Sequence, residues 1–281
     1  MCRVEGVGRA GGITVHVAGE GSAVLLLHGI GGGAASFVEQ QGKVSGFRTI
    51  AWDAPGYGAS ADLGVRDVAE EPADRYARAA VELLRGLGHE RAHVLGVSWG
   101  GVIAMRIALR YPELTRSLTL ADSTRGSGRT EDGRAGMARR VAELEVEGSD
   151  AFARRRAPKL LAPDAPAAMV ERVVATMARV RLAGYRGAAE MMAATDHTAE
   201  LGRLRVPTLV LVGEHDRVTG VSESRALAEG IPGARFEVLP GGGHAVNQEN
   251  PAAFNAALGR FLAEVENREN REDRPAGRAA V

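Results

Sequence analysis

The sequence contains one cysteine, Cys2, in 281 residues. A single thiol excludes an internal disulfide and any metal site built from several cysteines, and it fits a reducing cytoplasm. The first residues lack the basic and apolar stretches of a secretory signal, and no apolar run approaches the ~20 residues of a membrane span. We therefore expect a cytoplasmic protein with no membrane partner.

The chain also lacks a net charge, because 35 lysines and arginines balance 35 aspartates and glutamates. Without a net positive field, a nucleic-acid partner is not expected. The apolar fraction of 45% and the charged fraction of 25% are typical of a globular protein and exclude overall disorder. A chain of this length buries about three quarters of its unfolded surface, so its core needs no disulfide or metal.

Short apolar segments rich in β-branched residues alternate along the chain with longer amphipathic segments. This alternation predicts the α/β class, with a mostly parallel central sheet and helices on both faces. The predicted strands are residues 13–17, 23–27, 48–52, 93–97, 117–120, 208–212 and 235–239. The predicted helices are residues 67–86, 100–111, 222–229 and 252–265.

One segment, residues 125–195, interrupts this alternation because it contains helix-forming residues and no convincing strand. We interpret it as a helical lid inserted into an α/β core of residues 1–124 and 196–265, and we expect residues 266–281 to form a disordered tail. The lid segment has 13 basic and nine acidic side chains, a net charge of +4. Its arginines either form a solvated surface or attract an anionic substrate.

A candidate nucleophile, Ser98, lies in the sequence Gly96-Val97-Ser98-Trp99-Gly100, between a predicted strand and a predicted helix. In that context G-x-S-x-G predicts a nucleophile elbow. The tight turn needs glycines beside the serine because larger side chains would collide with the strand and the helix. The serine hydroxyl would then lie at the positive end of the helix dipole.

Candidate partners for Ser98 follow the last two predicted strands, with Asp216 after the first of them and His244 after the second. Open α/β sheets carry their functional groups at these carboxyl ends. Asp216 would fix the tautomer of His244, whose other ring nitrogen would accept the Ser98 proton. Asp122, near the end of an earlier strand, is the alternative acid.

A glycine-rich turn, residues 29–33, follows another predicted strand. The backbone N–H groups of Ile30 and Trp99 are candidates for an oxyanion hole, and we expect His28 to brace this turn. The remaining histidines lack metal-site spacing, and no phosphate-binding or dinucleotide motif opens a helix. The sequence therefore predicts neither a metal nor a cofactor.

Together these motifs resemble the α/β-hydrolase superfamily, and the resemblance extends over residues 13–261. The matching segments are His28-Gly29, Asp53 with Pro55-Gly56-Tyr57-Gly58 and Ser60, the turn at Ser98, residues 207–210 and 213–216, and His244. The resemblance implies a serine hydrolase with an inserted lid.

Within the superfamily the chain looks most like the 3-oxoadipate enol-lactonase branch. The similar segments are Ala121-Asp122-Ser123, Gly184-Tyr185, and His244 with Asn247, Glu249 and Pro251. Residues 53–58 instead resemble meta-cleavage C–C hydrolases, which typically have asparagine where this chain has Val97. Haloalkane dehalogenases need a carboxylate nucleophile, which Ser98 excludes.

We therefore predict cleavage of a small carboxylic ester or lactone. Ser98 would attack, His244 would transfer protons, and Asp216 would orient His244. One alternative is C–C bond hydrolysis of the meta-cleavage type. The other is a ligand-binding protein that keeps the fold without turnover. The sequence does not predict an oligomeric state.

Overall fold

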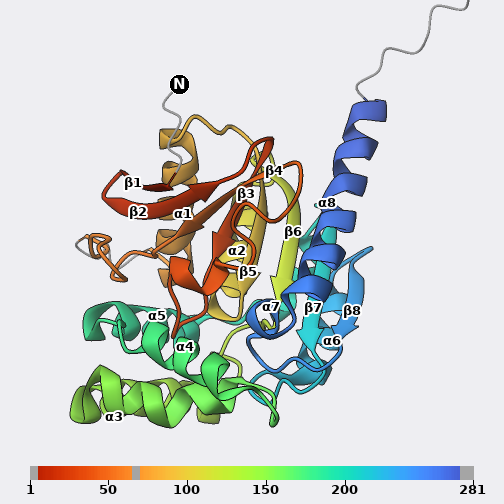
Figure 1. The fold of residues 1–281 in the computed structure, drawn as a ribbon. Coiled ribbons are helices and arrows are strands. Elements are labelled where there is room, and N and C mark those ends of the chain that lie inside the picture. Colours follow the sequence, from red (N-terminus) through yellow and green to blue (C-terminus); the bar gives the residue numbers. More distant parts are fainter. Residues whose placement is uncertain (1–5, 65–69, 273–281) are drawn as a thin grey trace, which may run out of the picture.

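The computed structural model describes residues 6–64 and 70–272, whose fold is shown in Figure 1. An eight-stranded sheet in the order β1-β2-β4-β3-β5-β6-β7-β8 forms its centre. Strands β3 to β8 are parallel, whereas β1 and β2 form an antiparallel edge. The predicted α/β class with a mostly parallel sheet is therefore confirmed.

The strands agree closely with the predicted segments. They are β1 (Gly6–Ala10), β2 (Ile13–Ala18), β3 (Ser22–Leu27), β4 (Phe47–Trp52), β5 (Ala92–Val97), β6 (Thr115–Ala121), β7 (Thr208–Gly213) and β8 (Arg235–Leu239). Only β1 was not predicted, because its sequence GVGRA has no apolar run and lies largely exposed at the edge of the sheet.

The helices are α1 (Pro72–Gly86), α2 (Trp99–Arg110), α3 (Glu131–Arg156), α4 (Ala167–Met177), α5 (Leu182–Ala194), α6 (Gly220–Gly230), α7 (Val246–Glu249) and α8 (Pro251–Glu272), with short 3-10 helices η1 (Ala34–Phe37), η2 (Ala157–Leu160) and η3 (Thr198–Arg203). The helices differ from the prediction at the start of α1, at the end of α8 and in the short helix α7, which was not predicted. Helix α1 begins at Pro72 rather than at residue 67, and residues 67–69 lie outside the described part. Proline favours a helix start because its fixed φ suits the first turn.

The predicted tail is wrong for residues 266–272, which continue α8 as helix. Arg116 of β6 forms ion pairs with both Glu266 and Glu269, and these contacts attach the end of the helix to the sheet. The sequence indicated disorder there because the segment has few apolar residues. Residues 273–281 lie outside the described part.

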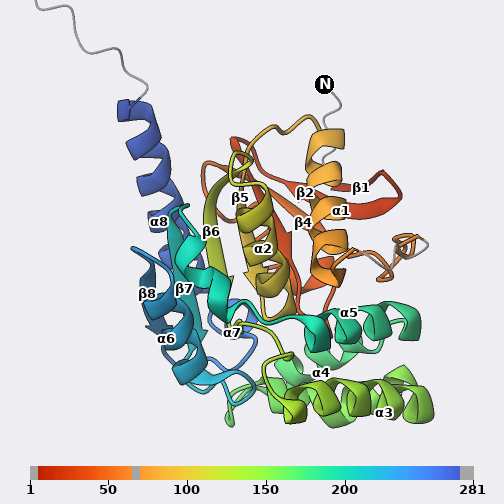
Figure 2. The ribbon, with the colours of Figure 1, turned by 180° about the vertical axis from the view of Figure 1, so that it is seen from behind.

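Both faces of the sheet are covered, as Figures 1 and 2 show, with α8 on one face and α1, α2 and α6 on the other. Along β3, Leu25 and Leu27 join the core beneath α1 and α2, while Val24 and Leu26 join the core beneath α8. Two covered faces explain why both alternations of the strand are apolar.

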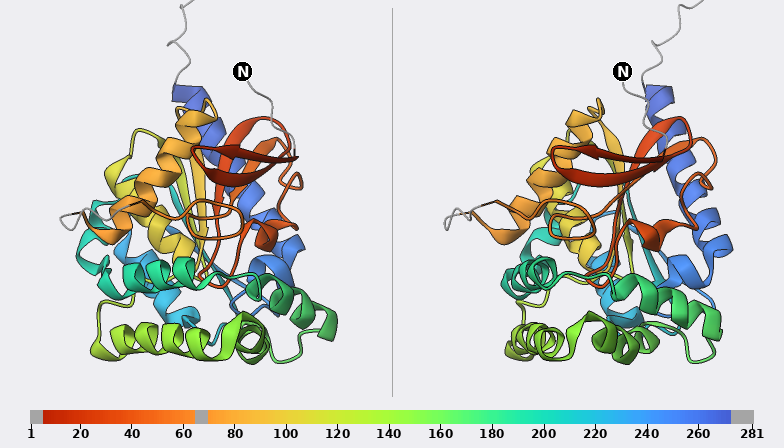
Figure 3. Two further views of the ribbon diagram at one scale, coloured as in Figure 1. Left: turned by 90° about the vertical axis from the view of Figure 1, so that its left-hand side faces the viewer. Right: turned by 60° about the vertical axis from the view of Figure 1, so that its left-hand side comes forward.

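Helices α3, α4 and α5, which we call the helical insertion, lie between β6 and β7 in the chain. They gather below the carboxyl ends of the parallel strands in the views of Figure 3. Helix α3 breaks at Gly148, where φ is 75°. A Cβ atom at Gly184 of α5 would lie 2.2 Å from the carbonyl oxygen of Gly56, so a glycine is needed where α5 meets the core.

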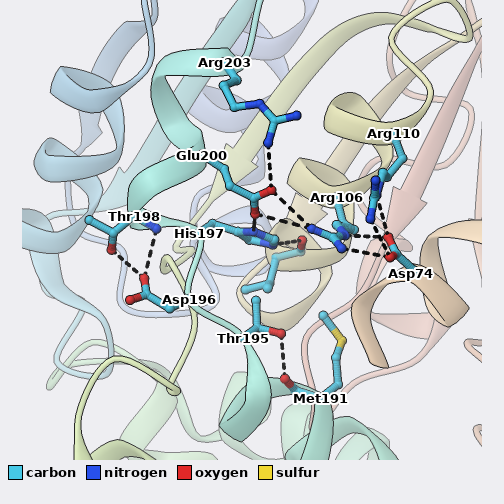
Figure 4. A network of polar contacts seen from close by, with 11 residues as sticks. Asp74, Arg106, Arg110, Met191, Thr195, Asp196, His197, Thr198, Glu200 and Arg203 are labelled. Atoms are coloured by element: carbon cyan, nitrogen blue, oxygen red, sulfur yellow. Dashed lines mark hydrogen bonds and ion pairs between the residues drawn. The ribbon is translucent and has the colours of Figure 1, made fainter. Parts of the chain in front are cut away.

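A network of charged side chains joins α1, α2 and η3 (Figure 4). Arg106 of α2 forms ion pairs with Asp74 of α1 and with Glu200 of η3, at 2.5 and 3.3 Å. Glu200 also accepts from the buried ring of His197 at 2.9 Å. Because Arg106 is nearly buried, its two carboxylate partners offset the cost of removing its charge from water.

Candidate active site

The candidate nucleophile Ser98 occupies the tight turn between β5 and α2. Its φ is 53°, a left-handed value that costs energy for a residue with a side chain. A Cβ at Gly96 would lie 2.2 Å from the Gly100 carbonyl oxygen, and one at Gly100 would lie 2.0 Å from the Leu27 carbonyl oxygen. The glycines of the motif are therefore required by close backbone packing.

The structure brings Ser98, His244 and Asp216 together, although they lie far apart in the sequence. The Ser98 hydroxyl oxygen is 2.9 Å from Nε2 of His244. The Nδ1 atom of the same ring is 3.0 and 3.1 Å from the two carboxylate oxygens of Asp216. His244 is nearly buried and the Asp216 side chain is fully buried, so these contacts are shielded from water.

Asp216 and His244 each shift the pKa of the other. Burial alone would raise the pKa of Asp216, but hydrogen bonds from His244, the Thr219 hydroxyl and the Val218 N–H hold it well below the usual range. Burial alone would lower the pKa of His244, but the hydrogen bond and charge of Asp216 raise it. The ring therefore binds a proton more readily than a free imidazole does.

Asp122, the alternative acid, is buried directly after β6 and does not contact the His244 ring through a hydrogen bond in the described part of the chain. Its carboxylate oxygens accept from the backbone N–H groups of Gly213 and Val246, at 2.8 and 3.2 Å. These groups belong to the segments that carry Asp216 and His244. Burial raises the pKa of Asp122 to about 7. Asp122 thus joins two segments of the site.

The two predicted oxyanion donors border one hollow together with Ser98. Trp99 is the first residue of α2, where a backbone N–H has no acceptor within the helix. The Tyr57 hydroxyl donates to the Ile30 carbonyl at 2.9 Å and fixes that turn. A Cβ at Gly29 would lie 3.4 Å from Cβ of Ser98, so the turn runs directly beside the serine.

His28 has the bracing position that we expected. Its Nε2 accepts from the Ala54 N–H at 3.1 Å, and its Nδ1 lies 2.8 Å from the Gly29 carbonyl oxygen. The ring is fully buried, and burial lowers its pKa. A neutral ring with both nitrogens engaged holds the glycine-rich turn against the Asp53–Gly58 loop.

A pocket with about 760 Å³ of empty space, including its open mouth, lies over Ser98 and His244. Part of its wall comes from the helical insertion, through Arg140, Arg156, Val173, Met177 and Tyr185. The sequence did not identify these residues, because the direction of a side chain on an inserted helix depends on how that helix packs.

Within the described residues, no group of three or more histidine, cysteine, aspartate or glutamate side chains is placed to hold a metal ion. The same part of the chain has no helix that combines the length and the apolar character needed to cross a membrane. The polar residues that line the pocket are Ser36, Ser98, Arg140, Arg156, Thr176, Tyr185, His244, Asn247 and Gln248.

Comparison with known proteins extends these observations. A family model described as alpha/beta hydrolase fold matches residues 22–251. A RutD protein of Variovorax paradoxus, named as a carbamate hydrolase, is 34% identical over 89% of this chain and 95% of its own length. Carbamate hydrolases are a class that the sequence resemblance did not include.

Other relatives match the resemblances found in the sequence. The 3-oxoadipate enol-lactonase 2 of Acinetobacter baylyi is 29% identical, covering 74% of this chain and 76% of its own. The 2-hydroxy-6-oxo-6-phenylhexa-2,4-dienoate hydrolase of Burkholderia cepacia is also 29% identical, covering 89% and 91%.

A solved structure agrees with the fold. A thermophilic esterase from Thermogutta terrifontis, with malate bound, has a TM-score of 0.82 and 27% identity over 90% of this chain and 93% of its own. The chain therefore belongs to the alpha/beta-hydrolase fold family.

Proposed function

We propose that the protein is a serine hydrolase that cleaves a small carboxylic ester or lactone through an acyl-enzyme on Ser98. The observation that carries this proposal is the 2.9 Å contact between the Ser98 hydroxyl and His244, whose ring also contacts Asp216. A serine hydroxyl is a weak nucleophile until a neighbouring base accepts its proton. His244 is in position to be that base.

In the first half of the reaction, Ser98 Oγ attacks the substrate carbonyl carbon while His244 Nε2 takes the hydroxyl proton. Asp216 stabilises the imidazolium that forms, in keeping with the raised pKa of His244. The carbonyl oxygen becomes an oxyanion, which the N–H groups of Ile30 and Trp99 would bind. Such donors favour the transition state because the negative charge develops only there.

In the second half, His244 returns its proton to the leaving alcohol oxygen, the bond to that oxygen breaks, and the acyl group stays on Ser98. A water molecule then gives a proton to His244 and attacks the acyl carbon. Collapse of this second intermediate releases the carboxylic acid and restores the Ser98 hydroxyl. In a lactone the leaving oxygen remains part of the same product.

We assign the helical insertion, within residues 125–195, the role of a lid over this chemistry. Its helices supply part of the pocket wall that faces Ser98. A closed wall excludes bulk water and strengthens the electrostatic contacts inside the site. The α/β core of residues 1–124 and 196–265 would then hold the reacting groups, and the lid would select the substrate.

Two other bond types are compatible with the same residues. The carbamate hydrolase relatives favour cleavage of a carbamate, and residues 53–58 together with the dienoate hydrolase relative favour C–C bond hydrolysis. A panel of short esters, lactones, carbamates and ring-fission dienols, assayed with pure protein, separates these chemistries. Turnover of the dienols without turnover of esters would favour C–C hydrolysis.

The role of Ser98 is tested by covalent labelling with a fluorophosphonate, which reacts with an activated serine. We expect mass spectrometry to find the adduct on Ser98, and Ser98→Ala to remove both the adduct and the hydrolysis of p-nitrophenyl acetate. Ser222→Ala, at an exposed position on α6, is the matched control and keeps both.

An adduct on a different serine would refute the assignment. If no adduct forms and Ser98→Ala has the same ester hydrolysis rate as the wild type, the protein is instead a binding protein that keeps the fold.

A further inference from the structure

Two arginines of α3, Arg140 and Arg156, line the same pocket as Ser98 and His244. Both also border an adjoining hollow beside Leu160 and Val218. The positive charge of Arg140 also reaches His244, where it weakly opposes the rise in pKa that Asp216 causes. These guanidinium groups therefore belong to the surroundings of the reacting groups and not to a remote surface.

The two arginines differ from the other half-buried arginines of residues 125–195 because they have no acidic partner. The other half-buried arginines form ion pairs: Arg125 with Glu223, Arg155 with Glu143 and Glu147, and Arg172 with Glu39. Across the described residues, no carboxylate lies within ion-pair distance of Arg140 or Arg156. The nearest acidic side chain along α3, Glu143, is engaged by Arg155 at 2.9 Å.

Holding two cations side by side in a pocket without a carboxylate partner is unfavourable, and the contact of Arg140 with the Tyr185 hydroxyl supplies no negative charge. Burial lowers the pKa of Arg156, and the positive charge of Arg140 lowers it further. The surrounding residues keep Arg156 in place, because its guanidinium lies 5.4 Å from the centre of the Phe152 ring, which in turn packs edge-on against Tyr185. A bound anion would supply the missing counter-charge.

The rest of the pocket wall is mainly apolar, with Ile30, Val97, Leu160, Val173 and Met177. A ligand that fits this wall needs a short apolar body as well as an anionic end. A carboxylate matches the planar guanidinium group through two parallel hydrogen bonds.

We propose that Arg140 and Arg156 form a carboxylate-binding subsite, so that the substrate is a small ester or lactone carrying a free carboxylate. This inference rests on the proposed function of Ser98. It gives a structural reason for the positive charge of the inserted segment: two of its arginines face the reaction site, whereas others are neutralised by neighbouring glutamates.

A matched pair of substrates tests the proposal. Mono-p-nitrophenyl glutarate and p-nitrophenyl valerate have acyl chains of equal length, and only the glutarate ends in a carboxylate. We expect the wild type to prefer the glutarate ester in kcat/KM. Arg140→Met and Arg156→Met should each lower the ratio of kcat/KM for the two esters by about 10- to 100-fold, the usual value of a charge-assisted hydrogen bond.

Arg139→Met is the matched control, because Arg139 is an exposed neighbour on the same helix. It removes the same charge and should leave the ratio unchanged. Ser98→Ala supplies the uncatalysed rate, which is subtracted because a carboxylate can assist hydrolysis of its own ester. Circular dichroism checks that each variant is folded.

A second measurement uses only the wild type and does not depend on the folding of the variants. Added salt should raise KM for the glutarate ester through screening and leave KM for the valerate ester nearly unchanged. The subsite would be overturned if both esters showed equal salt dependence and if Arg140→Met and Arg156→Met did not lower the glutarate-to-valerate ratio of kcat/KM. In that case, Ser98-dependent turnover of the valerate ester would still support the proposed hydrolase function. Loss of Ser98 dependence for both esters would instead overturn the proposed function.

Discussion

At the scale of single residues, the proposed function makes Asp216 the group on which the activity of His244 depends most. We expect Asp216→Asn to lower kcat by about 10⁴-fold, because an amide stabilises the wrong tautomer of the imidazole. The measurement is kcat for the best ester of the panel, with thermal unfolding followed in parallel. The fold should be retained, because the amide still accepts hydrogen bonds from Val218 and Thr219.

The comparison variant for that prediction is Asp122→Asn. The NH2 group of the asparagine would face one of the two backbone N–H groups, of Gly213 or Val246, that Asp122 now accepts from. Two donors cannot form a hydrogen bond with each other, so we expect lower stability of the fold. A 10⁴-fold loss of kcat in Asp122→Asn at unchanged thermal stability, with a small effect of Asp216→Asn, would make Asp122 the acid.

The raised pKa of His244 predicts the pH dependence of the reaction. The base must be neutral to accept the Ser98 proton, so kcat/KM should fall as the pH decreases through the pKa of His244 in the free enzyme. Because Asp216 raises that pKa above the ordinary 6.5, the inflection should lie above 6.5. In Asp216→Asn the inflection of the residual activity should move to lower pH, and an unmoved inflection would mean that another group is being titrated.

The sequence predicted the positions of Ser98, Asp216 and His244 because each follows a strand within a short, distinctive motif. The strand ends then bring the three together. The role of Asp122 was less accessible, since its contacts are to backbone groups of distant segments. Arg140 and Arg156 could not be chosen from among many arginines, because their lack of acidic partners is a property of the packed helices.

At the scale of elements, the contact between α5 and the core depends on Gly184. A methyl group there would lie 2.2 Å from the Gly56 carbonyl oxygen, so the helix must move away. We expect Gly184→Ala to lower both thermal stability and kcat/KM, since the neighbouring Tyr185 lines the pocket. Thermal unfolding and ester hydrolysis measure the two effects.

Gly136→Ala on α3 is the control for this prediction. Its added methyl would have Arg139 as its nearest neighbour, at 3.9 Å. Replacing a glycine inside a helix by alanine should stabilise the fold by about 0.5–1 kcal/mol. If Gly184→Ala behaved in the same way, α5 would not depend on close backbone contact.

The elements that the sequence missed lack the usual local signals. Strand β1 has an exposed, glycine-rich sequence, and its backbone hydrogen bonds to β2 hold it in the sheet. The last turns of α8 have few apolar residues, and ion pairs between Arg116 and two glutamates of α8 attach them to the sheet. Both depend on partners elsewhere in the chain, which periodicity does not reveal.

At the scale of the whole molecule, the proposed function gives the α/β core and the helical insertion different roles. The sheet and its covering helices hold Ser98, His244 and Asp216, and the helical insertion supplies the pocket wall with the unpaired arginines. Truncation of a buried phenylalanine in each layer should therefore have different consequences for substrate choice. Phe261 of α8 and Phe152 of α3 are both buried and provide a matched pair.

We expect Phe261→Ala and Phe152→Ala each to lower the free energy of unfolding by about 3–5 kcal/mol, because each leaves a cavity in a packed core. Only Phe152→Ala should also lower the glutarate-to-valerate ratio of kcat/KM, since Phe152 supports both Arg156 and Tyr185. Urea unfolding and the paired ester assay measure the two quantities. If the glutarate-to-valerate ratio changed equally in both variants, substrate selectivity would follow the global stability of the fold. If the ratio stayed unchanged in both, Phe152 would not hold Arg156 in its binding position.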